Sequence, residues 1–175
     1  MFKKSFVVMS FPRTGSTLII GNINRYFGID AIQTHDPNFV PPHEDFTCII
    51  TKRDDLFNLL CSQLVMDHTH ESHAYSDKTV QPFCADPEKL NGLWAAHHEF
   101  YKTRNLTPYK KIIEIDFENL ISDPYYLFSR FNVVEQTTYE NNQRSPYRYQ
   151  DLITNLDELR EKYEYNIKSF PRNTQ

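Results

Sequence analysis

Glycine is scarce in this chain: only four occur among 175 residues, against ten prolines. Because glycine is the default residue where backbone must come close to another group, each of the few is informative, and Gly15 most of all. The three cysteines, Cys48, Cys61 and Cys84, lie far apart and form no Cys-x-x-Cys pair. Such sparse thiols exclude a disulfide framework and are typical of a reducing compartment, so we predict a cytoplasmic protein.

Long apolar runs and an excess of positive charge are missing as well. No segment approaches the roughly 18 apolar residues that span a bilayer. The short run after Lys3 and Lys4 lacks a cleavage site and is better explained as a buried strand than as a signal peptide. The formal net charge of −4 argues against a general nucleic-acid binder. We therefore predict no membrane and no nucleic acid among the partners.

Hydrophobic residues make up 39% of the chain and charged residues 24%, which excludes wholesale disorder. Repeats and Gly/Ser linkers are absent, so residues 1–175 are predicted to form a single domain. Apolar strand patterns alternate with helical ones. We expect strands at Ser5–Ser10, Phe46–Thr51 and Lys111–Asp116, and helices at Ser16–Phe27, Asp54–Met66, Pro87–Arg104, Asp123–Phe131 and Asp151–Tyr165. This alternation predicts an α/β fold, an open parallel sheet flanked by helices in three α/β/α layers.

The segment FPRTGSTLII follows the first expected strand and opens a helix. Gly15 lets the backbone approach a ligand, and Ser16 and Thr17 lie where free N–H groups and the helix dipole favour an anion. The guanidinium of Arg13 suits phosphate or sulfate oxygens. The segment therefore predicts a phosphate cradle, although it lacks the lysine of GxxxxGK[ST], and the competing interpretation is an ordinary strand-to-helix turn.

A second anion site is predicted where the next strand ends, at Lys52 and Arg53. The carboxyl ends of parallel strands meet at one sheet edge, which would bring this site near the first one. Taken alone, Lys52 and Arg53 are better explained as solvated charges at a strand end, before a helix that Asp54 or Asp55 caps. Two anion sites at one sheet edge favour the binding interpretation.

The segment Gln33–Asp45 carries candidates for a general base, because a hydroxyl nucleophile must lose its proton. These candidates are His35, Asp36, His43 and Glu44, of which at least half are expected to be plain loop residues.

Two further patterns indicate metals less specifically. Asp116 ends a strand as a Walker B carboxylate would, but the same residues also fit a strand followed by a helix start at Ser122, Asp123 and Pro124. His68, His70 and His73 could bind a divalent metal, yet no cysteine or well-spaced carboxylate completes the set. We predict no metal.

Three segments together resemble the sulfotransferases that use 3′-phosphoadenosine 5′-phosphosulfate (PAPS). PRTGST at Pro12–Thr17 is similar to that family's 5′-phosphosulfate loop, TKRDDLFNLLCS at Thr51–Ser62 to its 3′-phosphate motif, and DFENLISDP at Asp116–Pro124 to a segment after a later core strand. They occur in the family's order. The resemblance implies a P-loop-type sheet, PAPS as cofactor, adenosine 3′,5′-bisphosphate as product, and no metal.

The resemblance also implies roles for individual residues. Arg13 would neutralise charge on the leaving phosphate, and Thr14, Gly15, Ser16 and Thr17 would cradle the 5′-phosphosulfate. Arg53 would hold the 3′-phosphate, together with Cys61 at the family's serine position or with Ser62 beside it. His35 occupies the place of the family's base, with Asp36 and Glu44 as substitutes. Arg144, Ser145 and Arg148 would supply the basic loop that closes over the 3′-phosphate.

We therefore expect a sulfotransferase that moves a sulfuryl group to a hydroxyl or amine. The acceptor would be a small molecule, a carbohydrate or a peptide, and its binding region would be either reduced or completed by a second subunit, as in a homodimer. A P-loop kinase with Mg²⁺ on Asp116 is one alternative. A non-catalytic protein that binds a nucleotide or a sulfated ligand on the same scaffold is another.

Overall fold

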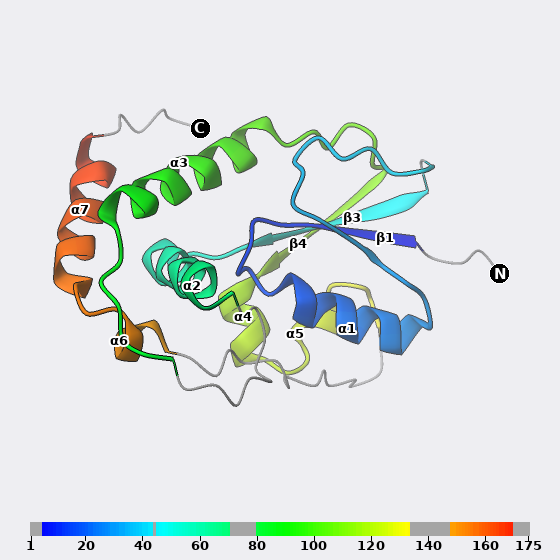
Figure 1. Ribbon diagram of the computed structural model, residues 1–175. Coiled ribbons are helices and arrows are strands. Elements are labelled where there is room, and N and C mark those ends of the chain that lie inside the picture. Colours follow the sequence, from blue (N-terminus) through cyan, green and yellow to red (C-terminus); the bar gives the residue numbers. More distant parts are fainter. Residues whose placement is uncertain (1–4, 44, 71–79, 134–147, 170–175) are drawn as a thin grey trace. The chain divides into compact units, whose positions relative to one another are not determined.

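A computed structural model describes residues 5–43, 45–70, 80–133 and 148–169. In chain order the elements are β1 (Ser5–Met9), α1 (Ser16–Phe27), β2 (Ile32–Thr34), β3 (Phe46–Lys52), α2 (Leu56–Thr69), α3 (Pro87–Thr103), β4 (Lys111–Asp116), α4 (Phe117–Ser122), α5 (Tyr126–Ser129), α6 (Tyr149–Leu152) and α7 (Leu156–Ser169). The fold belongs to the α/β class, as predicted (Figure 1).

The chain divides into two compact units, and each is described by itself. The first comprises Met1–Asp54 and Glu99–Gln143, and the second comprises Asp55–His98 and Arg144–Gln175. Helix α3 crosses the boundary, so only its last residues belong to the first unit. That residues 1–175 form one domain therefore stays a prediction.

All four strands belong to the first unit and form one parallel sheet in the order β2-β1-β3-β4. The chain leaves β1 toward β2 on one side and then returns to place β3 on the other side of β1. The sheet therefore has a topological switch point between the carboxyl ends of β1 and β3. In open α/β sheets this is where ligands bind.

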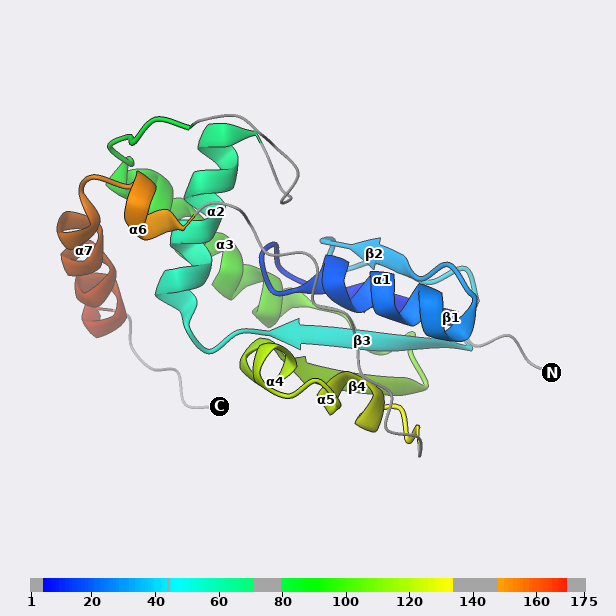
Figure 2. The ribbon, with the colours of Figure 1, turned by 90° about the horizontal axis from the view of Figure 1, so that it is seen from below.

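One face of the sheet carries the main apolar core. Side chains at alternate positions of the strands, such as Phe6, Val8 and Ile49, pack with Ile19 and Ile23 of α1. Leu120, Leu127 and Phe128 bring α4 and α5 onto the same core. Figure 2 shows that face, with α1 in front of β1 and α4 and α5 in front of β4.

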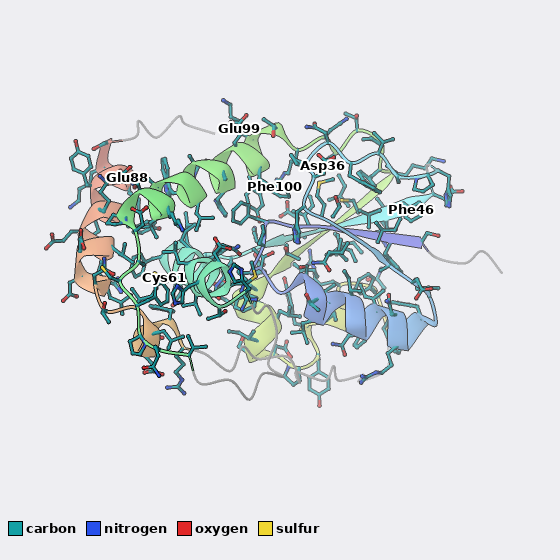
Figure 3. All side chains as sticks on the ribbon, viewed as in Figure 1. Asp36, Phe46, Cys61, Glu88, Glu99 and Phe100 are labelled. Atoms are coloured by element: carbon teal, nitrogen blue, oxygen red, sulfur yellow. The ribbon has the colours of Figure 1, made fainter. Side chains whose placement is uncertain are left out.

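The opposite face is covered by the end of α3 and the segment that follows it. Phe100 lies 6.0 Å from Phe11, centroid to centroid, and turns toward the sheet, whereas Glu99 is exposed (Figure 3). The hydroxyl of Tyr101 donates to the carbonyl of Thr51, 2.5 Å away. Helices thus flank both sides of the sheet, which is compatible with the predicted three layers.

The second unit is helical. Its helices α2, α6 and α7 meet around Phe57, which lies 5.3 Å from the ring of Tyr163 and 6.4 Å from that of Tyr149. Asn155 joins α7 to the start of α3 because its side chain exchanges hydrogen bonds with both backbone groups of Ala85. Within the described residues, no helix is both long and apolar enough to cross a bilayer.

Candidate functional site

The loop between β1 and α1 forms the centre of the candidate site, and its backbone is unusual. Arg13 and Gly15 both have left-handed backbone torsions, with φ of 67° and 84°. A side chain on Gly15 would place its Cβ 2.9 Å from Cδ2 of Phe117, so only glycine fits against α4 here. Gly15 is also the N-cap of α1 and offers no side-chain cap, which leaves the N–H groups of the first turn to a ligand or water.

Thr14 anchors this loop from within. Its hydroxyl donates to the carbonyl of Phe11, 2.7 Å away, and lies 2.5 Å from the hydroxyl of Thr51 at the end of β3. Both threonines are fully buried. Since the Thr14 side chain bonds inward, the part of this residue that could meet an anion is its backbone.

Arg53 follows β3 and is held against the loop. Its Nη1 donates to the carbonyl of Arg13 at 3.2 Å, and its Cζ lies 4.4 Å above the ring of Phe117. Burial, and next the charge of Arg53, lower the pKa of Arg13. Two neighbouring cations that raise each other's energy favour an anionic ligand, which would offset their repulsion.

Lys52, the other predicted cation, faces a different set of groups. Its Nζ lies 3.4 Å from Oδ1 of Asp116 and 3.5 Å from Oε2 of Glu114, both on β4. These carboxylates, Asp116 first, raise the pKa of Lys52. Tyr126 also donates to Oδ2 of Asp116 and accepts from its backbone N–H. Asp116 is therefore engaged by its neighbours within the fold.

His35 approaches the loop from the end of β2. Its Nδ1 lies 2.6 Å from the carbonyl of Ser10, the residue that follows β1. A carbonyl can only accept, so Nδ1 carries the proton and Nε2 of the neutral ring can accept a hydrogen bond. Gln33, on the same strand, donates to the hydroxyl of Ser16 at 2.9 Å. The predicted base and the predicted cradle are thus neighbours.

The remaining base candidates have other surroundings. Asp36 is exposed, and its Oδ1 accepts from the backbone N–H of Asn38, which makes a turn after β2. His43 stacks beside Phe46 at 4.5 Å, at the opposite end of β3 from Arg53. Glu44 lies outside the described residues.

The other predicted cofactor contacts all belong to the second unit, which is described by itself. Cys61 and Ser62 lie on α2, where Cys61 is buried (Figure 3). Burial raises the pKa of the Cys61 thiol to about 12, so the sulfur is uncharged at neutral pH. Arg148 is exposed just before α6, and Arg144 and Ser145 lie outside the described residues.

The histidine pattern gathers no metal site in the part of the chain that the structure describes. No group of three or more His, Cys, Asp or Glu side chains there is arranged to hold a metal ion. The ring of His68 stacks on Phe83 at 3.8 Å, and His73 lies outside the described ranges.

Two elements of the site were missed by the sequence patterns. Strand β2 brings Gln33 into the site, and α4 supplies Phe117. The β-branched residues Ile32 and Thr34, between Gly28 and Pro37, were the available signal for β2.

Neither a family model, nor a curated protein, nor a solved structure matches the chain.

Proposed function

We propose that the chain is a PAPS-dependent sulfotransferase with a P-loop-type sheet. One observation carries the proposal: Arg53 and His35 converge on residues 10–17, named here the anion loop, at the switch point of the sheet. Hydrogen bonds from Arg53 to the carbonyl of Arg13 and from His35 to that of Ser10 hold them there. Two cations can stabilise an anionic donor, and an accepting nitrogen can take the proton of an attacking hydroxyl or amine.

In this mechanism the loop N–H groups and Ser16 would bind the 5′-phosphosulfate, and Arg53 the 3′-phosphate. The acceptor oxygen or nitrogen attacks sulfur as the bond from sulfur to the bridging phosphate oxygen breaks, and adenosine 3′,5′-bisphosphate leaves. The proton of the acceptor passes to Nε2 of His35. Arg13 stabilises the charge that develops on the leaving phosphate.

The surroundings of Asp116 favour this proposal over a kinase. A Walker B carboxylate positions Mg²⁺, but Asp116 is paired with Lys52 and hydrogen-bonded to Tyr126. The loop also lacks the P-loop lysine. The acceptor class, a homodimer and a cytoplasmic location stay predictions.

Calorimetric titration with adenosine 3′,5′-bisphosphate in EDTA, with AMP and ATP as controls, tests the binding step. We expect Arg53→Ala to weaken the bisphosphate by roughly 10- to 150-fold, the equivalent of one charged hydrogen-bonding group, and to change AMP far less. Arg130→Ala removes an exposed arginine of the same unit and should change neither. Magnesium-dependent ATP binding without bisphosphate binding would favour the kinase, and no binding at all would refute a nucleotide site.

Substitution of the base separates the enzyme from a binding protein. His35→Gln should keep bisphosphate affinity and lower turnover by roughly 10²- to 10⁴-fold, the usual contribution of a general base. Turnover is measured by transfer of labelled sulfate from PAPS to a panel of phenols, amines and sugars. Wild-type protein that binds the bisphosphate but transfers nothing to any acceptor would support the non-catalytic alternative.

A further inference from the structure

Gln33 occupies a bridging position that the proposed reaction has not yet used. Gln33 and His35 are two residues apart along β2 and its continuation, so their side chains extend on the same side of the strand. The amide nitrogen of Gln33 donates to Oγ of Ser16 at 2.9 Å, and the same nitrogen lies 3.4 Å from Nε2 of His35.

The protonation states of these groups are mutually consistent. Because Nδ1 of His35 donates to the carbonyl of Ser10, Nε2 must accept in the neutral ring. An amide NH₂ has two hydrogens, so Gln33 can donate one to Oγ of Ser16 and the other to Nε2 of His35. Ser16 accepts from Gln33 and therefore keeps its own hydrogen for an anion on the loop.

We infer that Gln33 is a positioning residue that joins the hydroxyl of Ser16 in the anion loop to Nε2 of His35. This inference rests on the proposed function for the identity of the anion and for the role of His35. Hydrogen bonds in a chain polarise one another, so an anion on Ser16 changes the bond that Gln33 makes with His35.

The contact between Gln33 and His35 is also easily replaced. At 3.4 Å it is long for a hydrogen bond, so an acceptor hydroxyl displaces the amide from Nε2 at little cost. Gln33 thus keeps the lone pair of Nε2 directed at the site until the acceptor arrives. Loss of Gln33 should leave His35 present but less well oriented.

The first test uses the free protein, with ¹⁵N-labelled histidine and NMR detection of the ring nitrogens. Wild-type His35 should show a protonated Nδ1, and its Nε2 signal should move toward that of a nitrogen without a hydrogen bond in Gln33→Met. Gln33→Asn, which is one methylene shorter, should give the same change. Gln81→Met, at an exposed glutamine in the second unit, should leave the signal unchanged. A protonated Nε2 in wild type, or identical spectra in Gln33→Met and wild type, overturns the inference.

The second test adds adenosine 3′,5′-bisphosphate, whose 5′-phosphate occupies the loop. The Nε2 signal of His35 should shift in wild type and shift less than half as far in Gln33→Met at saturation. Turnover of Gln33→Met should fall about tenfold in kcat with little change in KM for PAPS. Equal shifts in both proteins overturn the inference. If wild type does not bind the bisphosphate, the proposed function fails, whereas the free-protein spectra still decide the role of Gln33.

Discussion

At the scale of single residues, Arg13 combines a strained backbone with a side chain suited to an anion. Its φ of 67° lies in the left-handed region, which costs a non-glycine residue roughly 1–2 kcal/mol. Such strain persists only where the surrounding structure enforces it, and it concentrates at functional sites. Here the hydrogen bond from Arg53 to the carbonyl of Arg13 and the packing of Gly15 on Phe117 enforce it.

Because of this strain, glycine at position 13 should give a more stable protein than alanine, which is the reverse of their usual order. Arg13→Gly should have a free energy of unfolding about 0.5–1 kcal/mol above that of Arg13→Ala, because the relief of strain exceeds the entropy that glycine adds to the unfolded chain. Both variants should lose affinity for adenosine 3′,5′-bisphosphate. Urea denaturation measures the first effect and calorimetry the second.

The same pair of substitutions at Arg25, in the last turn of α1, serves as the control. There alanine should be the more stable by up to about 1 kcal/mol, the ordinary helical order. If alanine is also the more stable at position 13, Arg13 is not strained in solution.

At the scale of elements, the turn from β1 to α1 depends on its contact with α4. Gly15→Ala should lower the free energy of unfolding by roughly 1–3 kcal/mol, since the new Cβ meets Phe117 and the left-handed backbone disfavours alanine. Gly21→Ala, in the middle of α1 with nothing within 4 Å of its Cβ, should instead be neutral or stabilising by up to about 1 kcal/mol. Chemical denaturation of both variants checks this, and equal stabilities would contradict the described packing of α4.

Much of the first unit was predictable because its patterns are local. The expected helix Ser16–Phe27 is confirmed, with Gly28 as its left-handed C-cap, and the strand Lys111–Asp116 is confirmed as β4. Both have strong apolar periodicity or β-branched runs within a few residues.

The elements that were missed depend on contacts between distant segments. The expected helix Asp123–Phe131 is wrong in its extent: α4 covers Phe117–Ser122 and α5 only Tyr126–Ser129. Helix α4 has six residues and only Leu120 buried, so no periodic stripe marks it. Strand β2 has three residues and exists through its pairing with β1.

The candidate site was predictable only in part for the same reason. A strand followed by Pro12–Thr17 indicates an anion loop without any knowledge of tertiary structure. That Lys52 faces carboxylates of β4 while Arg53 contacts the loop was not predictable from the sequence. It results from the register of β3 against β4, which sets Lys52 opposite Asp116. Likewise, the parallel pairing that starts with Val7 beside Ile32 brings Gln33 near Ser16.

At the scale of the whole molecule, each unit contains one buried thiol, Cys48 in the first and Cys61 in the second. Burial raises the pKa of both to about 12. In the unfolded chain a thiol titrates near 8.5. Because the folded pKa values are raised, the stability these thiols contribute is complete below about pH 8.5 and is lost as the pH rises toward 12.

Pulsed alkylation across a urea series, in a Cys84→Ser background, follows these two thiols separately. If the predicted single domain is correct, Cys48 and Cys61 should become reactive at the same urea concentration. Raising the pH from 8 to 10 should lower the urea midpoint at which Cys61 becomes reactive. The midpoint should fall less in Cys48→Ala than in the parent protein that keeps Cys48. Separate midpoints for the two thiols would show that the two units unfold independently.

The brevity of β2 has a consequence for how the site fails. This edge strand of three residues carries Gln33 and leads into His35. The anion loop instead follows β1, which pairs with β3 over five positions. Local opening of β2 therefore requires far less free energy than separation of the central strands. If the proposed function is correct, mild heating or low denaturant should thus create a population that still binds the anionic donor but has lost His35, the proposed proton acceptor. In such a population, the donor should still be bound while turnover is lost, at a temperature or denaturant concentration well below that at which the sheet unfolds.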